Sequence, residues 1–158
     1  MSSQNAASET YILFEVAGTT YGVSSRNVQQ IEMIDHITPL PNAAAFVEGV
    51  VFTRGQVVPA INVRLRFGFE KAAHTTRTRL VVTNYQGRIV GLIVDSAREF
   101  LSIQDSAVQP APSCMAEMSG KYLKGIVTIG DRIVLVIDLG ELVNVEQTRA
   151  AALEAQVE

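Results

Sequence analysis

The sequence predicts an all-β protein, a barrel or a sandwich of about ten short strands. Runs of apolar, β-branched and aromatic residues of strand length recur along the 158-residue chain, and such runs are typical of strands. They are separated by tight turn sequences such as Ala17-Gly18, Gln86-Gly87 and Gly130-Asp131. Stretches with helical periodicity are few. Many short strands with so little helix favour a closed or two-layered β architecture.

Each expected strand is an apolar run that ends at turn residues. At Gly130 the glycine supplies the positive φ that a tight connection needs at its first central position. In chain order, the expected strands are 10–16, 20–23, 30–34, 47–52, 56–63, 79–83, 88–95, 98–103, 123–129 and 132–139.

Helix is expected in two places only. A short helix is predicted over 25–30, with Ser24 or Ser25 as its N-cap, because serine oxygens accept from the first free N–H groups. A second helix is predicted from about Gly140 into the alanine-rich tail, where Leu142 and Val143 form an apolar face.

The polar segments indicate one folded domain with two tails. Residues 1–9 are small and polar and are expected to be a disordered tail. The domain is expected over 10–145, followed by a helical or frayed tail over 146–158. Segments 70–78 and 110–120 are expected to be loops inside that domain.

The clearest motif is GVVFTRGQVVPAINVRLRFG, which joins two strand-like runs through a turn that presents an arginine. This segment resembles the central signature of the CheW family. In that family a glycine and an apolar strand are followed by Arg-Gly, then Val/Ile-Pro, then Asp-Leu-Arg. The matching positions are Gly49, Arg54, Gly55, Pro59 and Arg64.

The resemblance extends from Tyr11 to about Val145. TYILFEVAGTTYGV is similar to the family's opening hairpin, RIVGLIVDSAREFLSIQDSAVQPAP to its middle block, and KYLKGIVTIGDRIVLVIDLGELV to its closing hairpin and helix. The family's usual residues are replaced at Gln30, Phe52-Thr53, Asn62, Ala97 and Phe100. These replacements leave the receptor preference open.

The resemblance implies two five-stranded SH3-like barrels packed on a shared apolar interface. It also implies a non-enzymatic adaptor that joins the cytoplasmic tips of chemoreceptors to the regulatory domain of a CheA-type histidine kinase. The family binds receptors at a groove between the barrels, and its kinase contact lies on another face, whose residues we do not assign. The positions that match the receptor groove are Arg54, Gly55, Val28, Ile31, Gly49, Ala97, Phe100 and Gly125.

Without the resemblance, Arg54 beside a glycine in a turn has two interpretations. Exposed charges in turns are usually solvated and contribute little. Alternatively, Gly55 permits a tight turn and Arg54 projects a planar fork of five donors toward a partner. The resemblance favours the second interpretation, contact with a partner. For the apolar and small groove positions, ordinary packing stays open beside receptor contact.

Composition limits the partners and the compartment. A net charge of −3 offers no basic field for nucleic acid or anionic lipid. Cys114 is the only cysteine, so no intrachain disulfide is expected and a reducing cytoplasm fits. The N-terminus has no signal-peptide pattern, and no apolar run is long enough to span a membrane. We expect a cytoplasmic protein recruited to membrane-associated receptor arrays.

We recognise no catalytic, metal-binding or cofactor-binding motif in the sequence. His36 and His74 are isolated from any cysteine or carboxylate at metal-ligand spacing. We therefore expect neither an enzyme nor a cofactor. Two alternatives stay open: a CheW-like scaffold controlling pili or another output, and a small all-β ligand-binding barrel. A nucleic-acid-binding barrel is opposed by the acidic balance and the absence of tryptophan.

Overall fold

The computed structural model describes residues 7–112 and 120–144. Ten strands lie within these two ranges, and each differs from its expected bounds by two residues or fewer. The strands are β1 (Ser8–Val16), β2 (Thr19–Ser24), β3 (Val28–Met33), β4 (Val47–Thr53), β5 (Gln56–Asn62), β6 (Arg79–Tyr85), β7 (Arg88–Val94), β8 (Ser96–Gln104), β9 (Leu123–Ile129) and β10 (Arg132–Ile137).

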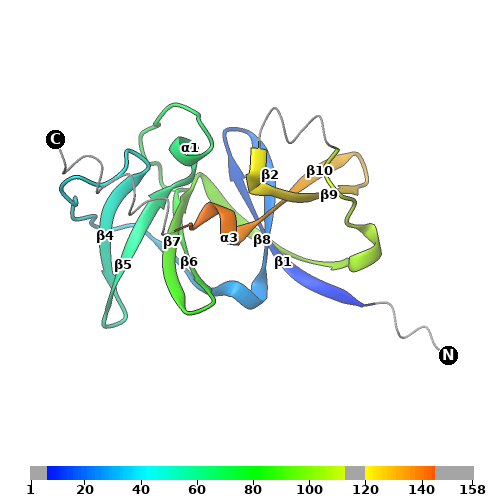
Figure 1. Ribbon diagram of the computed structural model, residues 1–158, viewed down its shortest axis with the longest axis horizontal. Coiled ribbons are helices and arrows are strands. Elements are labelled where there is room, and N and C mark those ends of the chain that lie inside the picture. The colour runs from blue at the N-terminus through cyan, green and yellow to red at the C-terminus, as the bar shows by residue number, and fades with distance from the viewer. Residues whose placement is uncertain (1–6, 113–119, 145–158) are drawn as a thin grey trace.

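The strands form two five-stranded sheets that lie side by side along the long axis of the molecule (Figure 1). The first has the order β8-β1-β2-β10-β9, and the second the order β3-β6-β7-β5-β4. Both sheets are mixed, because β10 runs parallel to β2 and β5 runs parallel to β7. The all-β prediction is therefore confirmed.

The two sheets repeat one topology that the sequence does not reveal. Each combines a hairpin, β1–β2 or β6–β7, with a run of three strands, β8–β10 or β3–β5. The chain passes from the first sheet to the second after β2 and returns after β7. The first sheet therefore draws on two separate stretches of the chain, whereas the second is formed by the single stretch between them, from β3 to β7.

Each sheet curls so that its two outer strands meet. In the second sheet, Thr53 on β4 donates to Glu32 on β3 at 2.5 Å, although β3 and β4 stand at opposite ends of the strand order. In the first sheet, Ile103 on β8 and Val127 on β9 share one apolar cluster. We therefore call the two sheets the first and second barrels.

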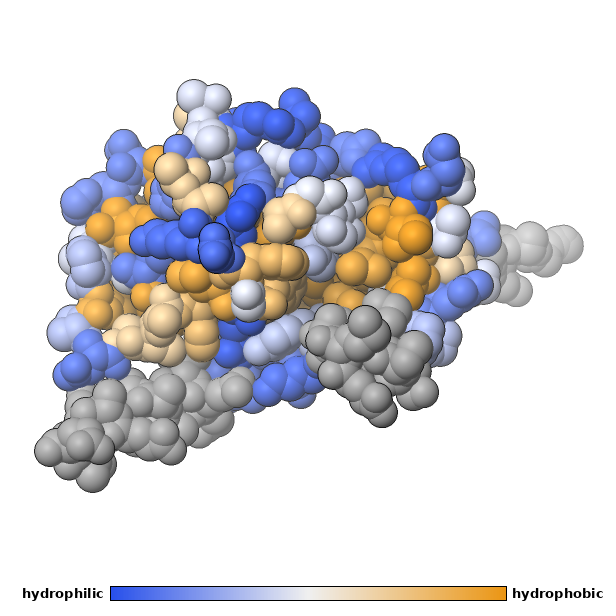
Figure 2. All heavy atoms as spheres, turned by 90° about the horizontal axis from the view of Figure 1, so that it is seen from above, coloured by the Kyte–Doolittle hydropathy of each residue, from blue (hydrophilic) through white to orange (hydrophobic). Residues whose placement is uncertain are grey.

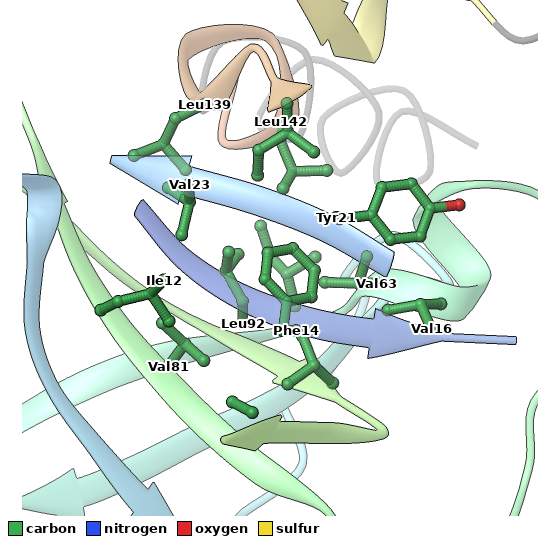
Figure 3. Close-up of a cluster of buried hydrophobic side chains, with 14 of the residues drawn as sticks. Ile12, Phe14, Val16, Tyr21, Val23, Val63, Val81, Leu92, Leu139 and Leu142 are labelled. Atoms are coloured by element: carbon green, nitrogen blue, oxygen red, sulfur yellow. The ribbon is translucent and has the colours of Figure 1, made fainter. Parts of the chain in front are cut away.

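Three apolar clusters form the core, one inside each barrel and one between them. On β1, Tyr11 and Leu13 point into the first barrel, whereas Ile12, Phe14 and Val16 point toward the second barrel. A strand that is buried on both faces needs a continuous apolar run, because a strand with alternating apolar and polar residues can bury only one face. Figure 3 shows side chains from strands of both sheets converging with Val63, Leu139 and Leu142 in the cluster between the barrels.

The first predicted helix is present in a shortened form. A 3-10 helix, η2, spans Ser25–Asn27, and the Ser24 hydroxyl caps it by accepting from the Arg26 N–H at 3.2 Å. The prediction was wrong for 28–30, because Val28 pairs with Thr83 on β6 and the chain continues as β3. Pairing along a sheet edge outweighs the weak local preference for helix.

A helix that the sequence did not predict, α1, spans Val63–Arg66. The expected strand ends one residue early, at Asn62, whose side-chain oxygen accepts from the Leu65 N–H at 3.1 Å. The Asn62 amide also donates to Glu48. Asparagine at this departure from the family pattern therefore keeps the cap acceptor and gains a donor. The short 3-10 helices η3 (Asp105–Ala107) and η4 (Gly120–Tyr122) were also not predicted.

The last described helix, α3, spans Leu139–Leu142, and Asp138 caps it in the way that Asn62 caps α1. It follows β10, which ends at Ile137 and not at the expected residue 139. The predicted continuation was wrong for 143–144, which are not helical, and from 145 onward it lies outside the described residues, as does Cys114. Segment 70–78 forms the expected loop. The domain and tail boundaries stay predictions, although β1 begins at Ser8.

Candidate functional site

Arg54 and Gly55 form the predicted tight turn between β4 and β5. Their φ angles are 51° and 81°, so the turn has the left-handed backbone that suits the twist of a two-residue hairpin. The Arg54 side chain is 71% exposed, and its Nε lies 3.9 Å from a Glu32 carboxylate oxygen on β3. An exposed contact at that distance holds the guanidinium only weakly. The Arg54 fork therefore stays accessible to a partner.

Glu32 is the centre of a polar group that joins the two edges of the second barrel. It accepts hydrogen bonds from the Thr53 hydroxyl and the Gln30 amide, and the Gln30 amide also lies 3.3 Å from the Thr53 oxygen. Gln30 stands where the CheW signature commonly has glutamate. In this chain the Gln30 amide donates to Glu32, two residues further along, and the Glu32 carboxylate faces Arg54.

Three of the predicted apolar site residues meet at the boundary between the barrels. Val28 and Ile31 on β3 are half-buried and pack against the cluster between the barrels, and Ala97 on β8 is buried in it. Phe100, also on β8, is instead 67% exposed. Viewed from above in Figure 2, apolar residues reach the surface over the middle of the molecule, with hydrophilic residues around them.

Two of the three predicted site glycines, Gly49 and Gly125, are packed against the chain's own backbone. A Cβ at Gly49 would lie 2.0 Å from the Thr38 carbonyl oxygen, and one at Gly125 would lie 2.8 Å from the Gln109 carbonyl oxygen. Thr38 and Gln109 each form an isolated β-bridge to the residue after the glycine. The close approach that these glycines permit is therefore internal to the chain. Their contact with a receptor stays a prediction.

Sequence reasoning missed an apolar surface beside the Arg54 turn. Phe52 on β4 is 73% exposed and stands opposite Val57, which is also exposed. Phe52 and Met33 border an open groove of about 610 Å³ that Asp35 and His36 also line. Strand alternation could have found it, because Val51 and Thr53 point inward and so place Phe52 outward.

Arg64, one of the motif positions, does not face this surface. Its guanidinium makes two hydrogen bonds to Asp95, at 2.9 and 2.8 Å. Asp95 lies between β7 and β8, where the chain crosses back to the first barrel, and it also accepts from the Ala17 N–H at 2.9 Å. Burial raises the pKa of the Asp95 carboxyl, but the Arg64 fork and the Ala17 N–H outweigh it and hold that pKa below its usual value.

We expect Asp95→Asn to reduce the loss of stability at acid pH. A carboxyl whose pKa is lowered on folding contributes stability that is present above its unfolded pKa, near 4, and is lost as the pH falls through the folded pKa. Asparagine does not titrate. Urea unfolding of both proteins between about pH 6 and pH 2 measures this. Equal pH slopes below pH 4 in the two proteins would contradict the role assigned to Asp95.

Among the described residues, no group of three or more His, Cys, Asp and Glu side chains could hold a metal ion. His74 lies 3.8 Å from Glu48 without further ligands beside it. No helix in the described part of the chain is long and apolar enough to cross a membrane. The arrangement offers contact surfaces, namely an exposed guanidinium, exposed aromatics and half-buried apolar strand residues.

Residues 10–147 match the family model described as the CheW-like domain. The chain belongs to the CheW family. CheW proteins are non-enzymatic scaffolds that couple chemoreceptors to the CheA kinase. The chain is therefore a chemotaxis adaptor, as the sequence predicted, and it is not an enzyme.

Individual relatives agree with this family over most of their length. The chain is 29% identical to the chemotaxis protein CheW of Klebsiella aerogenes over 139 residues, and this alignment covers 88% of this chain and 84% of that protein. It is 30% identical over 140 residues to the chemotaxis protein CheW of Rhizobium meliloti, with 89% and 90% covered. The crystal structure of the scaffolding protein TtCheW from Thermoanaerobacter tengcongensis matches with a TM-score of 0.80 at 26% identity, covering 86% of this chain and 92% of that one. This match supports SH3-like barrels.

Proposed function

We propose that this CheW-family protein works in the cytoplasm and binds the cytoplasmic tips of chemoreceptors at the boundary between its two barrels. The proposed surface comprises Arg54, Gly55, Val28, Ile31, Ala97 and Phe100, with Gly49 and Gly125 supporting its shape. The observation that carries this proposal is the exposed Arg54 fork beside β3, whose Val28 and Ile31 reach the cluster between the barrels.

A helical receptor tip fits the chemistry of this surface. Helices bind by laying an apolar stripe on half-buried apolar side chains, while charges at the rim fix their orientation. Val28 and Ile31 supply apolar contact, and Arg54 supplies a directional charge. A CheA-type regulatory domain then binds on a separate face, to which no residues are assigned. With both partners bound, the adaptor recruits the kinase to receptor arrays at the membrane.

We expect Arg54→Glu to weaken binding to a receptor cytoplasmic fragment by about tenfold or more, because a reversed charge at an interface commonly costs about 1.4 kcal/mol or more. Kinase binding should stay within about twofold of the wild type, because that contact lies elsewhere. Titration calorimetry against each partner separately measures both affinities. Equal losses for the two partners in a folded variant would contradict the separation of the two surfaces.

Two control variants separate the possible causes. Arg88→Glu reverses the charge of an exposed arginine that follows another tight turn, that of the β6–β7 hairpin, and it should leave receptor binding unchanged. Glu32→Gln removes the acidic partner of Arg54 inside the chain. If Glu32→Gln weakens receptor binding as much as Arg54→Glu does, the role of Arg54 is internal and the proposed contact is wrong.

A further inference from the structure

Helix α1 belongs to the second barrel, but its last arginine binds the first. Arg66 Nε donates to the Leu142 carbonyl oxygen at 3.0 Å, and its Nη2 donates to the Glu141 carbonyl oxygen at 3.1 Å. Both acceptors lie at the end of α3, which follows β10 of the first barrel. The guanidinium also lies 4.3 Å from the Phe46 ring centroid and 5.1 Å from that of Tyr122. Two carbonyl acceptors and two aromatic rings around a buried, planar guanidinium hold the Arg66 side chain in one orientation.

Arg64 makes a second link between the barrels from the same helix. Its two hydrogen bonds hold Asp95, at the point where the chain leaves β7 for β8. The same carboxylate accepts from the N–H of Ala17, in the β1–β2 turn of the first barrel. Arg64 and Asp95 therefore tie α1, the crossover and a first-barrel turn into one group. Bidentate arginine–carboxylate pairs are directional as well as strong.

The contact is reciprocal, because α3 of the first barrel packs on the second. Gly140 in α3 lies so close to Tyr85 at the end of β6 that a Cβ there would be 2.8 Å from the tyrosine oxygen. In Figure 1, α1 and α3 both lie in the middle of the molecule, between the two sheets. The helix that follows each three-strand run, α1 after β3–β5 and α3 after β8–β10, thus contacts the other barrel.

We propose that Arg64, Arg66 and Asp95 form an inter-barrel clasp, which holds the two barrels as one rigid unit and so positions the receptor surface. Apolar contact is non-directional, so by itself it allows the two barrels to slide against each other. Two guanidinium forks that bond from one helix fix the angle between the barrels. The positioning part of this proposal rests on the proposed function, because that surface takes Val28 and Ile31 from the second barrel and Phe100 from the first. A rigid adaptor passes a displacement of the receptor on to the kinase, whereas a hinged one absorbs it.

The first test measures the distance between the barrels in the free protein, without any partner. Nitroxide labels are placed in a Cys114→Ser background on cysteines at Arg88 and Thr128, which are exposed and lie in different barrels. Pulsed electron paramagnetic resonance then gives the distribution of inter-label distances. We expect Arg66→Lys and Asp95→Asn to widen that distribution by about twofold or more. An ammonium cannot replace the Arg66 fork, and an asparagine offers the Arg64 fork one acceptor oxygen instead of two.

Arg132→Lys is the matched control. Arg132 makes the same two-bond contact, at 2.9 and 3.4 Å, with Glu99, but both residues belong to the first barrel. The control variant should keep the wild-type distribution. If Arg66→Lys and Asp95→Asn stay folded by circular dichroism and also keep the wild-type width, the clasp does not hold the barrels and the proposal is overturned.

The second test measures binding of the same variants to a receptor cytoplasmic fragment and to the kinase regulatory domain. We expect the clasp variants to bind the receptor fragment about tenfold more weakly, and Arg132→Lys to bind it like the wild type. Barrels that loosen without loss of receptor affinity would overturn the positioning role. A wild-type protein that binds no receptor fragment would overturn the proposed function and the positioning role with it, while the distance measurement would still decide the clasp.

Discussion

Gly49→Ala should leave the protein unfolded or barely stable. The added Cβ would lie 2.0 Å from the Thr38 carbonyl oxygen and 2.9 Å from the Pro39 Cα, so the backbone on both sides would have to move. Gly49 also has a φ of 149°, a conformation that side chains other than glycine rarely adopt. Strain and overpacking together should cost roughly 4 kcal/mol or more, against a total stability of about 5–15 kcal/mol for a domain of this size.

Gly55→Ala is the control that separates the clash from the backbone conformation. Gly55 has a φ of 81°, but nothing lies within 4 Å of the position that an added Cβ would take. The variant should lose only about 1–2 kcal/mol, which is the cost of the left-handed conformation. Guanidinium unfolding of both variants measures the difference. Equal losses of unfolding free energy in the two variants would show that the backbone at Thr38 moves away at little cost and that the internal packing of Gly49 is unimportant.

Leu142→Ala should destabilise the protein by about 3 kcal/mol, because a fully buried leucine leaves a cavity that its neighbours fill only in part. Leu142 is 0% exposed and lies in the cluster between the barrels (Figure 3). α3 has only four residues, so its place depends on this packing and on the Arg66 bonds to its last carbonyls. Thermal unfolding should show a midpoint lowered by several degrees.

The matched control for Leu142→Ala is Ile133→Ala, which removes an aliphatic side chain of the same size from the preceding strand. Ile133 is 59% exposed, so its loss should change stability by about 0.5 kcal/mol or less. If both variants lose similar stability, the cluster between the barrels contributes less than its burial indicates. A loss confined to Leu142→Ala would show that short α3 is anchored by that cluster.

The sequence determined the ten strands, because each depends on local chemistry. A strand of five to nine residues needs an apolar run and a turn signal at its ends, and both can be read without knowing the partner strand. The turns at Ala17-Gly18, Arg54-Gly55 and Gln86-Gly87 follow the same rule, and all six residues have positive φ. The motif from Gly49 to Arg64 likewise indicated the CheW family, and the family model that matches residues 10–147 agrees.

Local chemistry could not predict α1 or the exact roles of the glycines. At Val63 the β-branched side chain favours a strand, but the Asn62 cap and the burial of Val63 between the barrels turn the chain into a helix. For Gly49 the sequence left ordinary packing and receptor contact open, and only the structure shows that the Thr38 carbonyl packs against it. Which backbone approaches a glycine depends on segments eleven residues or more away in the chain, which no local pattern encodes.

The sequence by itself therefore determined the strands, the turn that exposes Arg54 and the family. Only the tertiary structure decided how the two barrels are joined. Arg66 and the carbonyls of α3 are separated by 75 and 76 residues, and Ala17 and Asp95 by 78. Hydrogen bonds across such separations arise from the way the chain crosses between the sheets after β2 and β7. The physical reason is that residue type fixes what a side chain can bind, while topology fixes which groups come within its reach.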